Sequence, residues 1–256
     1  MATACELALL YNDRSVLENH HASFSGRLFR RHDLGIFHHL PAEEQHQFEE
    51  LFMECVLATD ISSNFELCAQ FRRGQKMTTS RGSSSFRGSR RGSVEDNLMS
   101  TCRSFILKRD SFKMLAGMLL KCADVGHCGK DWEIHKRFSD AIQEEFYRQG
   151  DKERELDLPI SPYMDRQNKG NVAKNQLGFF EFLVQPMLAT MSTVVRMQDV
   201  IEGVEENLAA WKRLAEAWNK EKRDEGSSNQ GLQTKTADMS TDNTEGADKL
   251  TSVMVS

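Results

Sequence analysis

The sequence predicts an all-α fold, a compact bundle of helices. Apolar residues recur every three or four positions in several long segments, which is the spacing that puts side chains on one face of a helix. No segment shows the alternation of apolar and polar residues that is typical of a half-buried strand. A chain of 256 residues is long enough for one sizeable domain with additional tails.

The first long helix is expected after Ser15. Glu18 follows three positions later, the pattern of a capping box in which the serine side chain accepts a hydrogen bond from an early helical amide. A polar loop then leads to Pro41, which suits the first turn of a second helix. The apolar residues of that helix begin near Phe48 and lead directly to Asp60.

Residues 72–96 have a different composition. Seven basic residues and no acidic one occur from Arg72 to Val94, where Gly and Ser dominate. Such a segment buries too little apolar surface to offset its ordering entropy, so it predicts a disordered insert, with a solvated loop as the plainer alternative. Arg90-Arg91-Gly92-Ser93 is similar to the sites of basophilic protein kinases of the cAMP-dependent type, and Ser93 is therefore a candidate phosphorylation site.

The second half of the chain carries four more predicted helices. The first ends at Asp124, the second starts near Trp132, a mostly buried one covers 170–191, and an amphipathic one runs from Val200 to Trp218. The expected apolar faces of the first two comprise Phe112, Leu115, Ala116, Leu119 and Leu120, and then Ile134, Phe138, Ala141, Ile142 and Phe146. We expect the domain to cover residues 1–222 and a disordered tail to cover 223–256.

Composition argues against several classes of protein. The net charge of −5 gives no indication of a nucleic-acid partner. The longest apolar run, 177–188, is interrupted by polar residues and by Pro186, so it is too short to span a bilayer. With no zinc-finger spacing and no secretory signal, the six cysteines are expected to be reduced thiols in the cytoplasm, and zinc at Cys122, His127 and Cys128 is disfavoured.

Residues 121–151 carry the strongest functional signal. A helix ends at Asp124, a glycine-containing turn carries His127, and an amphipathic helix follows from about Trp132. A carboxylate at the end of a buried helix is costly unless it has a partner. A metal ion and a plain salt bridge both satisfy this requirement.

Four further segments occur in a fixed order around that stretch. They are Tyr11-Asn12-Asp13 with Ser15–His21, Ala58-Thr59-Asp60, Ile160-Ser161-Pro162, and Asn175–Phe179. Together, over residues 5–222, they resemble the catalytic domain of the class I 3′,5′-cyclic nucleotide phosphodiesterases, most closely the calmodulin-stimulated branch. The resemblance implies a cytoplasmic signal-transduction enzyme that hydrolyses cAMP, cGMP or both to the 5′-monophosphate.

The resemblance also implies two metal ions, Zn²⁺ and Mg²⁺ (or Mn²⁺). Asp124 matches one of the family's four direct ligands, two His and two Asp. Glu18 and Thr59 match positions that hold the second metal's waters through hydrogen bonds. Asp60 lies beside them as a helix cap or an ion-pair partner, and His20 and His21 are expected to support the site rather than bind metal.

The family's other three ligands and its general-acid His lie in H-N-x-x-H and H-D-x-x-H-x-x-x-N segments that this sequence lacks. His32-Asp33 does not replace them, because the following His and Asn are missing. The chain thus looks like the C-terminal two-thirds of the catalytic domain without its N-terminal helices, and we expect it to be inactive alone. The alternatives are a non-catalytic nucleotide-binding or interaction module, which pairs with itself or a full-length subunit, and a purely structural fragment.

The sequence contains more of the family's nucleotide-binding residues than of its metal ligands. Gln176 matches the glutamine that reads the purine edge, since its amide both donates and accepts. Phe179 matches the aromatic residue that stacks on the purine, and Ile142, with Phe146 one turn later, matches the opposite side of that clamp. The alternative is that these three apolar residues belong to the core. His127 replaces an Asn of many relatives, which favours acceptance of both cAMP and cGMP.

Overall fold

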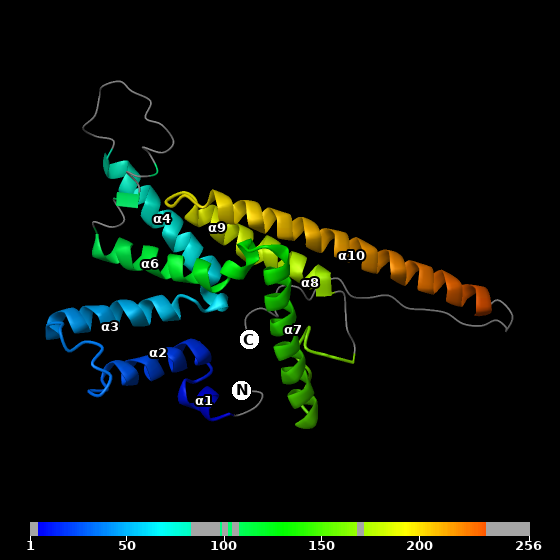
Figure 1. The fold of residues 1–256 in the computed structure, drawn as a ribbon, viewed down its shortest axis with the longest axis horizontal. Coiled ribbons are helices and arrows are strands. Elements are labelled where there is room, and N and C mark those ends of the chain that lie inside the picture. The colour runs from blue at the N-terminus through cyan, green and yellow to red at the C-terminus, as the bar shows by residue number, and fades with distance from the viewer. Residues whose placement is uncertain (1–4, 83–97, 99–101, 104–107, 168–171, 234–256) are drawn as a thin grey trace, which may run out of the picture. The chain divides into compact units, whose positions relative to one another are not determined.

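The computed structural model describes residues 5–82, 98, 102–103, 108–167 and 172–233, and in these ranges the chain is helical, with no strand. The all-α prediction is therefore confirmed. Figure 1 labels the helices along the chain. The chain divides into two units. The first unit comprises Met1–Lys130 and Phe182–Glu202, and the second comprises Asp131–Glu181 and Gly203–Ser256.

The first unit is built around helix α6. Its helices are α1 (Glu6–Leu10), α2 (Val16–Phe29), α3 (Ala42–Leu57), α4 (Asn64–Gly82), α6 (Arg109–Asp124) and α9 (Gln185–Met191). Helix α6 packs against α3, α4 and α9, and α2 packs against α3. Short 3₁₀ turns, Ile61–Ser63 and Gly126–Gly129, follow α3 and α6. Ala58–Asp60 separate α3 from the first of these turns, and Val125 separates α6 from the second.

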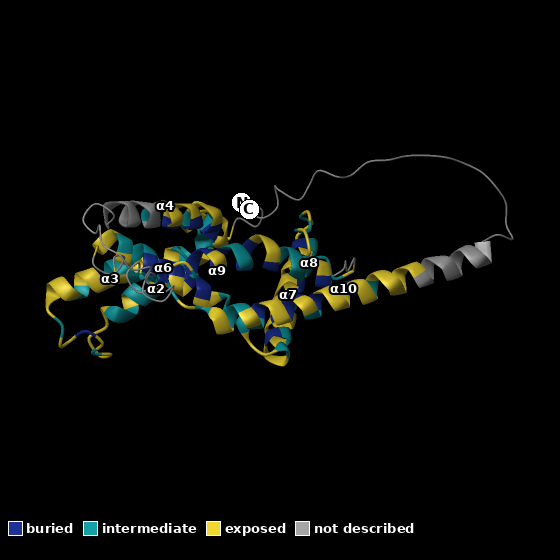
Figure 2. Ribbon diagram, turned by 90° about the horizontal axis from the view of Figure 1, so that it is seen from above, coloured by how far each residue is buried: buried dark blue, intermediate teal, exposed yellow. Residues whose placement is uncertain are grey.

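The core of the first unit lies where α4, α6 and α9 meet (Figure 2). Phe71, Met118, Met187 and Met191 are fully buried there. Each comes from one of these three helices, and methionine adapts readily to irregular gaps between helices. The core therefore supports the α6 end that carries Asp124.

The second unit contains α7 (Trp132–Glu155), α8 (Val172–Phe179) and most of α10 (Gln198–Gln233). After α8 the chain forms one π-helical turn, Phe180–Val184, and then continues as α9. Pro186 lacks an amide hydrogen, which favours such a local change of helical hydrogen bonding. The helix predicted over 170–191 is thus present from Val172, and its first two residues lie outside the described part.

The predicted apolar faces of α6 and α7 are only partly buried. On α7, Phe138 is 54% exposed, and Ile134, Ile142 and Phe146 are exposed as well. The buried residues of this helix are His135, Ser139, Tyr147, Gly150 and Glu153. On α6, Leu115 is buried as expected, but Phe112, Leu119 and Leu120 are exposed. Apolar character alone identified the wrong face of α7.

Helix α2 begins at Val16 as expected, but the capping box does not form. Ser15 adopts a left-handed conformation, with φ 42° and ψ 53°, and its side chain makes no capping hydrogen bond. The hydroxyl donates instead to the carboxylate of Asp60 at 2.5 Å. The prediction of a capping box is wrong because Ser15 does not adopt the extended backbone conformation of an N-cap residue, and its side chain binds Asp60 instead.

Helical structure extends into both segments that the sequence predicts to be disordered. Helix α4 reaches Gly82, within the segment 72–96, and α10 reaches Gln233, beyond the start of the predicted tail. Residues 83–96, with the candidate phosphorylation site Ser93, and residues 234–256 lie outside the described part. A search of the described helices for a membrane-spanning segment found none of sufficient length and apolarity.

Candidate functional site

Asp124 is the last residue of α6, and its side chain is exposed. Within the described residues, its carboxylate takes part in no hydrogen bond or ion pair, although its charge acts on Lys121 and His127. Burial lowers the pKa of His127, and the nearby charge of Asp124 opposes that shift. The carboxylate is therefore available to an external cation, since oxygen ligands suit hard divalent ions.

Thr59 and Asp60 follow the end of α3. The Thr59 hydroxyl donates to the carbonyl of Val56 at 2.7 Å, which leaves its oxygen able to accept a hydrogen bond from water. Asp60 accepts from the amide of Ser62 at 2.8 Å and so caps the 3₁₀ turn Ile61–Ser63. Of the two roles considered for Asp60, the capping role is the one seen. Its carboxylate also holds Ser15, which precedes α2.

Lys121 is buried, only 2% exposed, three residues before Asp124. Its ammonium donates to the carbonyl oxygens of Ala58, Thr59 and Asp60 at 3.0, 3.2 and 2.6 Å. Burial lowers the pKa of Lys121, whereas the charges of nearby carboxylates, Asp60, Asp124 and Glu18, raise it. All three N–H groups of the ammonium thus donate to carbonyl oxygens at the C-terminal end of α3.

Lys121 thus lies near the three predicted metal-side residues, Asp124, Glu18 and Thr59, and near Asp60. Glu18 is half-buried on α2, and its charge reaches the same ammonium as those of Asp60 and Asp124. Thr59 lies between two of the carbonyls that bind Lys121. Sequence reasoning missed Lys121. The available signal was a lysine between Leu120 and Cys122 in an otherwise apolar part of α6.

Two histidines of α2 and one in the loop after it are near the candidate site in sequence. His20 lies 6.4 Å from the rings of both Tyr11 and Phe24, which are packing contacts. His21 is exposed on α2. Asp33 forms an exposed ion pair with Arg31 in the loop after α2, so the His32-Asp33 dipeptide stays a loop feature.

The cysteines behave as structural thiols. Burial raises the pKa of both Cys122 and Cys128 to about 12, so these groups are protonated thiols at neutral pH. A protonated thiol is neither a nucleophile nor a metal ligand. None of the six cysteines forms a disulfide, which agrees with the expectation of reduced thiols. That Cys122, His127 and Cys128 hold no zinc stays a prediction.

The predicted nucleotide residues Gln176, Phe179, Ile142 and Phe146 lie in the second unit. Gln176 and Phe179 are half-buried and one turn apart on α8. The side-chain amide of Gln176 makes no hydrogen bond to the described part of the chain, so its donor and acceptor are available. Ile142 and Phe146 are exposed one turn apart on α7, and do not belong to the core.

Ring contacts support the end of α8. The ring of Phe179 contacts that of Phe180 with centroids 6.3 Å apart. Phe180 is fully buried and packs edge-on against His135 of α7 at 5.4 Å. The position of Phe179 is therefore fixed by the interior of the second unit and does not depend on a surface loop.

The loop between α7 and α8 is held to α7 by charge. The Arg166 guanidinium donates two hydrogen bonds to Glu144, at 2.8 and 3.0 Å, and one to Asp151 at 2.9 Å. It also lies over the ring of Tyr147 at 5.1 Å. This pairing lowers the pKa of Glu144 to about 2. Bidentate arginine–carboxylate contacts are among the strongest and most directional charge-assisted hydrogen bonds.

Two further sets of contacts hold the same loop against α7. Glu153 accepts from the amide and hydroxyl of Ser161 at 2.6 and 2.7 Å. Gly150 lies so close to the loop that an added Cβ would be 1.9 Å from the carbonyl oxygen of Met164. Tyr163 remains exposed, with φ 66°, and its carbonyl accepts from Gln143. The loop that precedes α8 is therefore anchored along much of α7.

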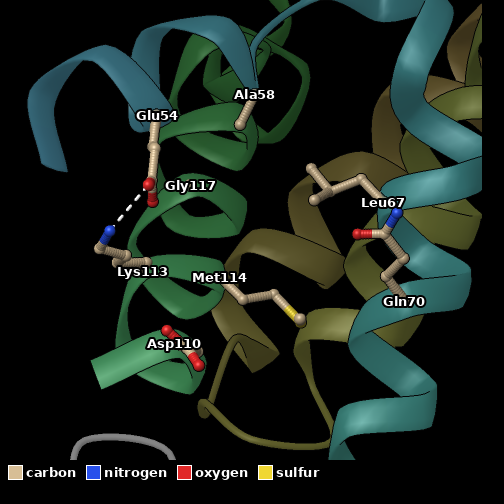
Figure 3. A pocket seen from close by; sticks show the side chains of 8 residues that line it. All are labelled: Glu54, Ala58, Leu67, Gln70, Asp110, Lys113, Met114 and Gly117. Atoms are coloured by element: carbon tan, nitrogen blue, oxygen red, sulfur yellow. Dashed lines mark hydrogen bonds and ion pairs between the residues drawn. The ribbon is translucent and has the colours of Figure 1, made fainter. Parts of the chain in front are cut away.

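A cavity of about 290 Å³ lies between α3, α4 and α6 of the first unit. Figure 3 shows Met114 extending from α6 toward Leu67 and Gln70 of α4, and the ion pair of Lys113 with Glu54 at the side. The remaining lining residues are Ala58, Asp110 and Gly117. None of the predicted site residues lines this cavity, so it is separate from the candidate site.

Comparison with known proteins defines the class to which this arrangement belongs. The family model described as 3′5′-cyclic nucleotide phosphodiesterase matches residues 1–204, and the chain belongs to this family. This confirms the resemblance drawn from the five segments.

Particular relatives agree with the branch predicted. The chain is 38% identical over 192 residues to the dual specificity calcium/calmodulin-dependent 3′,5′-cyclic nucleotide phosphodiesterase 1 of Drosophila melanogaster and to enzyme 1B of Mus musculus. These matches cover 75% of this chain but only 20% and 30% of those proteins. Thus the chain spans less than a third of the length of these curated relatives.

A solved structure is also similar. The phosphodiesterase domain of the RhoPDE fusion protein from the choanoflagellate Salpingoeca rosetta superposes with a TM-score of 0.70 at 26% sequence identity. The superposition covers 86% of this chain and 62% of that one. The helical arrangement described above is thus that of a phosphodiesterase domain.

Proposed function

We propose that this chain is the nucleotide-binding and metal-supporting part of a cytoplasmic 3′,5′-cyclic nucleotide phosphodiesterase. The complete enzyme hydrolyses cAMP, cGMP or both to the 5′-monophosphate. The observation that carries the proposal is the pair Gln176 and Phe179, one turn apart on α8 with the amide of Gln176 available. An amide and an aromatic ring on one helix face suit the edge and the face of a purine.

The residues present also fit one part of a metal centre. Asp124 offers an exposed carboxylate, and the Glu18 carboxylate and the Thr59 hydroxyl have oxygen atoms that are able to accept hydrogen bonds from metal-bound water. Bound Zn²⁺ and Mg²⁺ (or Mn²⁺) would supply an activated water and neutralise the charge on phosphorus. In this proposal Asp124 holds the metal directly, whereas Glu18 and Thr59 orient water.

Since the chain holds one of four expected direct ligands, we also propose that it has little activity alone. The rival function is a non-catalytic module that binds nucleotide, or that associates with a second copy or a longer subunit. The dual-specificity names of the relatives and the presence of His127 favour both cAMP and cGMP as ligands.

A fusion experiment separates these functions. The upstream segment of the Mus musculus relative, which would supply the missing histidines and aspartate, is fused to the N-terminus of this chain. The proposal expects metal-dependent release of 5′-monophosphate from the fusion and its loss in Asp124→Asn. A well-folded fusion that binds cyclic nucleotide but never hydrolyses it would instead favour the non-catalytic module.

A further inference from the structure

Lys121 is the one described lysine buried in the core of the first unit, and the function proposed above gives it no role. A buried ammonium is expensive unless its hydrogen bonds are all made. Here the three donors meet three successive backbone carbonyls, those of Ala58, Thr59 and Asp60. These carbonyls lie at the C-terminal end of α3, where a positive charge is favoured.

The position of Lys121 follows from the packing of α6 on α3. Arg109, Lys113, Gly117 and Lys121 are spaced four residues apart, so they lie along one stripe of α6. Arg109 and Lys113 pair with Glu50 on α3, and Lys113 also pairs with Glu54.

Gly117 lets the two helices approach closely, since an added Cβ there would lie 3.0 Å from the Cβ of Ala58. This close approach places the α3 end within reach of Lys121, one turn further along α6.

We propose that Lys121 is a positioning residue, which locks the segment Ala58–Asp60 to the end of α6 and so sets Thr59 and Asp60 beside Asp124. The proposal rests on the proposed function for its catalytic meaning, but the lock itself is a property of the folded chain. Through Asp60 the lock reaches Ser15 and the start of α2, which carries Glu18. One ammonium thereby fixes three elements that bear predicted metal-side residues.

The first test uses the unmodified chain. With ¹⁵N-labelled lysine, the ammonium of Lys121 should give an NMR signal protected from exchange with water at neutral pH, assigned by its absence in Lys121→Met. An exposed lysine exchanges too fast to give such a signal. If the unmodified chain shows no protected lysine ammonium, the lock is overturned, and this outcome needs no variant. A set of protected signals that is unchanged in Lys121→Met overturns the lock as well.

The second test measures where the lock acts. Hydrogen–deuterium exchange of residues 57–63 should become about tenfold faster or more in Lys121→Met, because three carbonyls lose their donor. The matched control, Lys113→Met, breaks ion pairs on the same two helices and should leave residues 57–63 unchanged. Equal acceleration in both variants, or throughout the first unit, would mean that Lys121 contributes only general stability.

Neither test needs metal or nucleotide. A fusion that fails to hydrolyse cyclic nucleotide would therefore refute the proposed function and leave the exchange results to decide the lock. Conversely, an active fusion with unchanged exchange in Lys121→Met would keep the function and remove Lys121 from it.

Discussion

The indole Nε1–H of Trp211 donates a hydrogen bond of 2.7 Å to Nε2 of His135 inside the second unit. Both side chains are buried, at 2% and 0% exposed. Because Nε2 accepts this bond, the neutral imidazole carries its proton on Nδ1. The contact ties α10 to the start of α7, next to Phe180, whose neighbour Phe179 is a predicted nucleotide residue.

Replacing Trp211 with Phe should destabilise the chain by about 1–3 kcal/mol, because it leaves a buried acceptor on His135 unsatisfied. Chemical denaturation followed by circular dichroism measures the change. The control is Trp218→Phe on the same helix, where the indole is half-buried beneath Lys222 and a smaller loss, of about 0.5 kcal/mol, is expected. Equal losses in both variants would show that ring size matters and the hydrogen bond does not.

The close contact of α3 and α6 predicts the effect of enlarging Gly117. Gly117→Val should cost about 1–3 kcal/mol, since even a Cβ would lie 3.0 Å from Ala58. Thermal unfolding is the measurement. Gly26→Ala is the control, because nothing lies within 4 Å of that position and the gain in helix propensity should stabilise α2 by about 0.5–1 kcal/mol. A valine tolerated without loss at position 117 would contradict the close packing.

The pairing of Arg166 with Glu144 predicts a pH-dependent contribution to stability. The pKa of Glu144 is lowered to about 2 in the folded chain, against an ordinary value of about 4.3 in the unfolded one. The stabilisation is therefore fully present above about pH 5 and is lost as the pH falls through the folded value. The difference in unfolding free energy between wild type and Glu144→Gln should shrink between about pH 4 and pH 2.

The control is Glu145→Gln, which removes one charge from the exposed face of the same helix. If it gave the same pH-dependent difference, net charge would explain the result and the Arg166 contact would not.

The positions of α2, α3, α6, α7 and α10 could be predicted from apolar periodicity. Helix α4 (Asn64–Gly82) was not predicted, because its second half falls in the Gly- and Ser-rich segment 72–96. The buried face of α7 could not be predicted either. His135 and Glu153 are polar, and they are buried because partners further along the chain satisfy them, Trp211 for His135 and Ser161 for Glu153. Such partners are separated in sequence, so a local pattern carries no trace of them.

The same reason explains the errors around the candidate site. A serine before an acidic first turn is normally a cap, but Ser15 binds Asp60 across 45 positions. A lysine is normally exposed, but Lys121 reaches three carbonyls more than 60 positions away. The predicted roles of Asp124, Glu18 and Thr59 came from family motifs, and their roles in catalysis stay predictions.

Gln176→Ala should weaken recognition of purine cyclic nucleotides. In the fusion described above, loss of the amide leaves polar base edges unpaired, which should lower kcat/KM by the equivalent of about 1–3 kcal/mol for both cAMP and cGMP. Gln185→Ala, a half-buried glutamine on α9, serves as the control. Unchanged kcat/KM for both nucleotides in Gln176→Ala would exclude Gln176 from the pocket.

Finally, the 256-residue chain alone should release little or no 5′-monophosphate from cAMP or cGMP in the presence of Zn²⁺ and Mg²⁺. Asp124 is the one direct ligand that we expect in this chain, whereas catalytic metal sites typically use three protein ligands. The family's general-acid histidine is also absent, and acid–base assistance alone contributes about 10²–10⁴-fold. Turnover of about one per second or more that disappears in Asp124→Ala would contradict this prediction. It would require other histidines of this chain, such as His20, His21 or His32, to complete the metal centre.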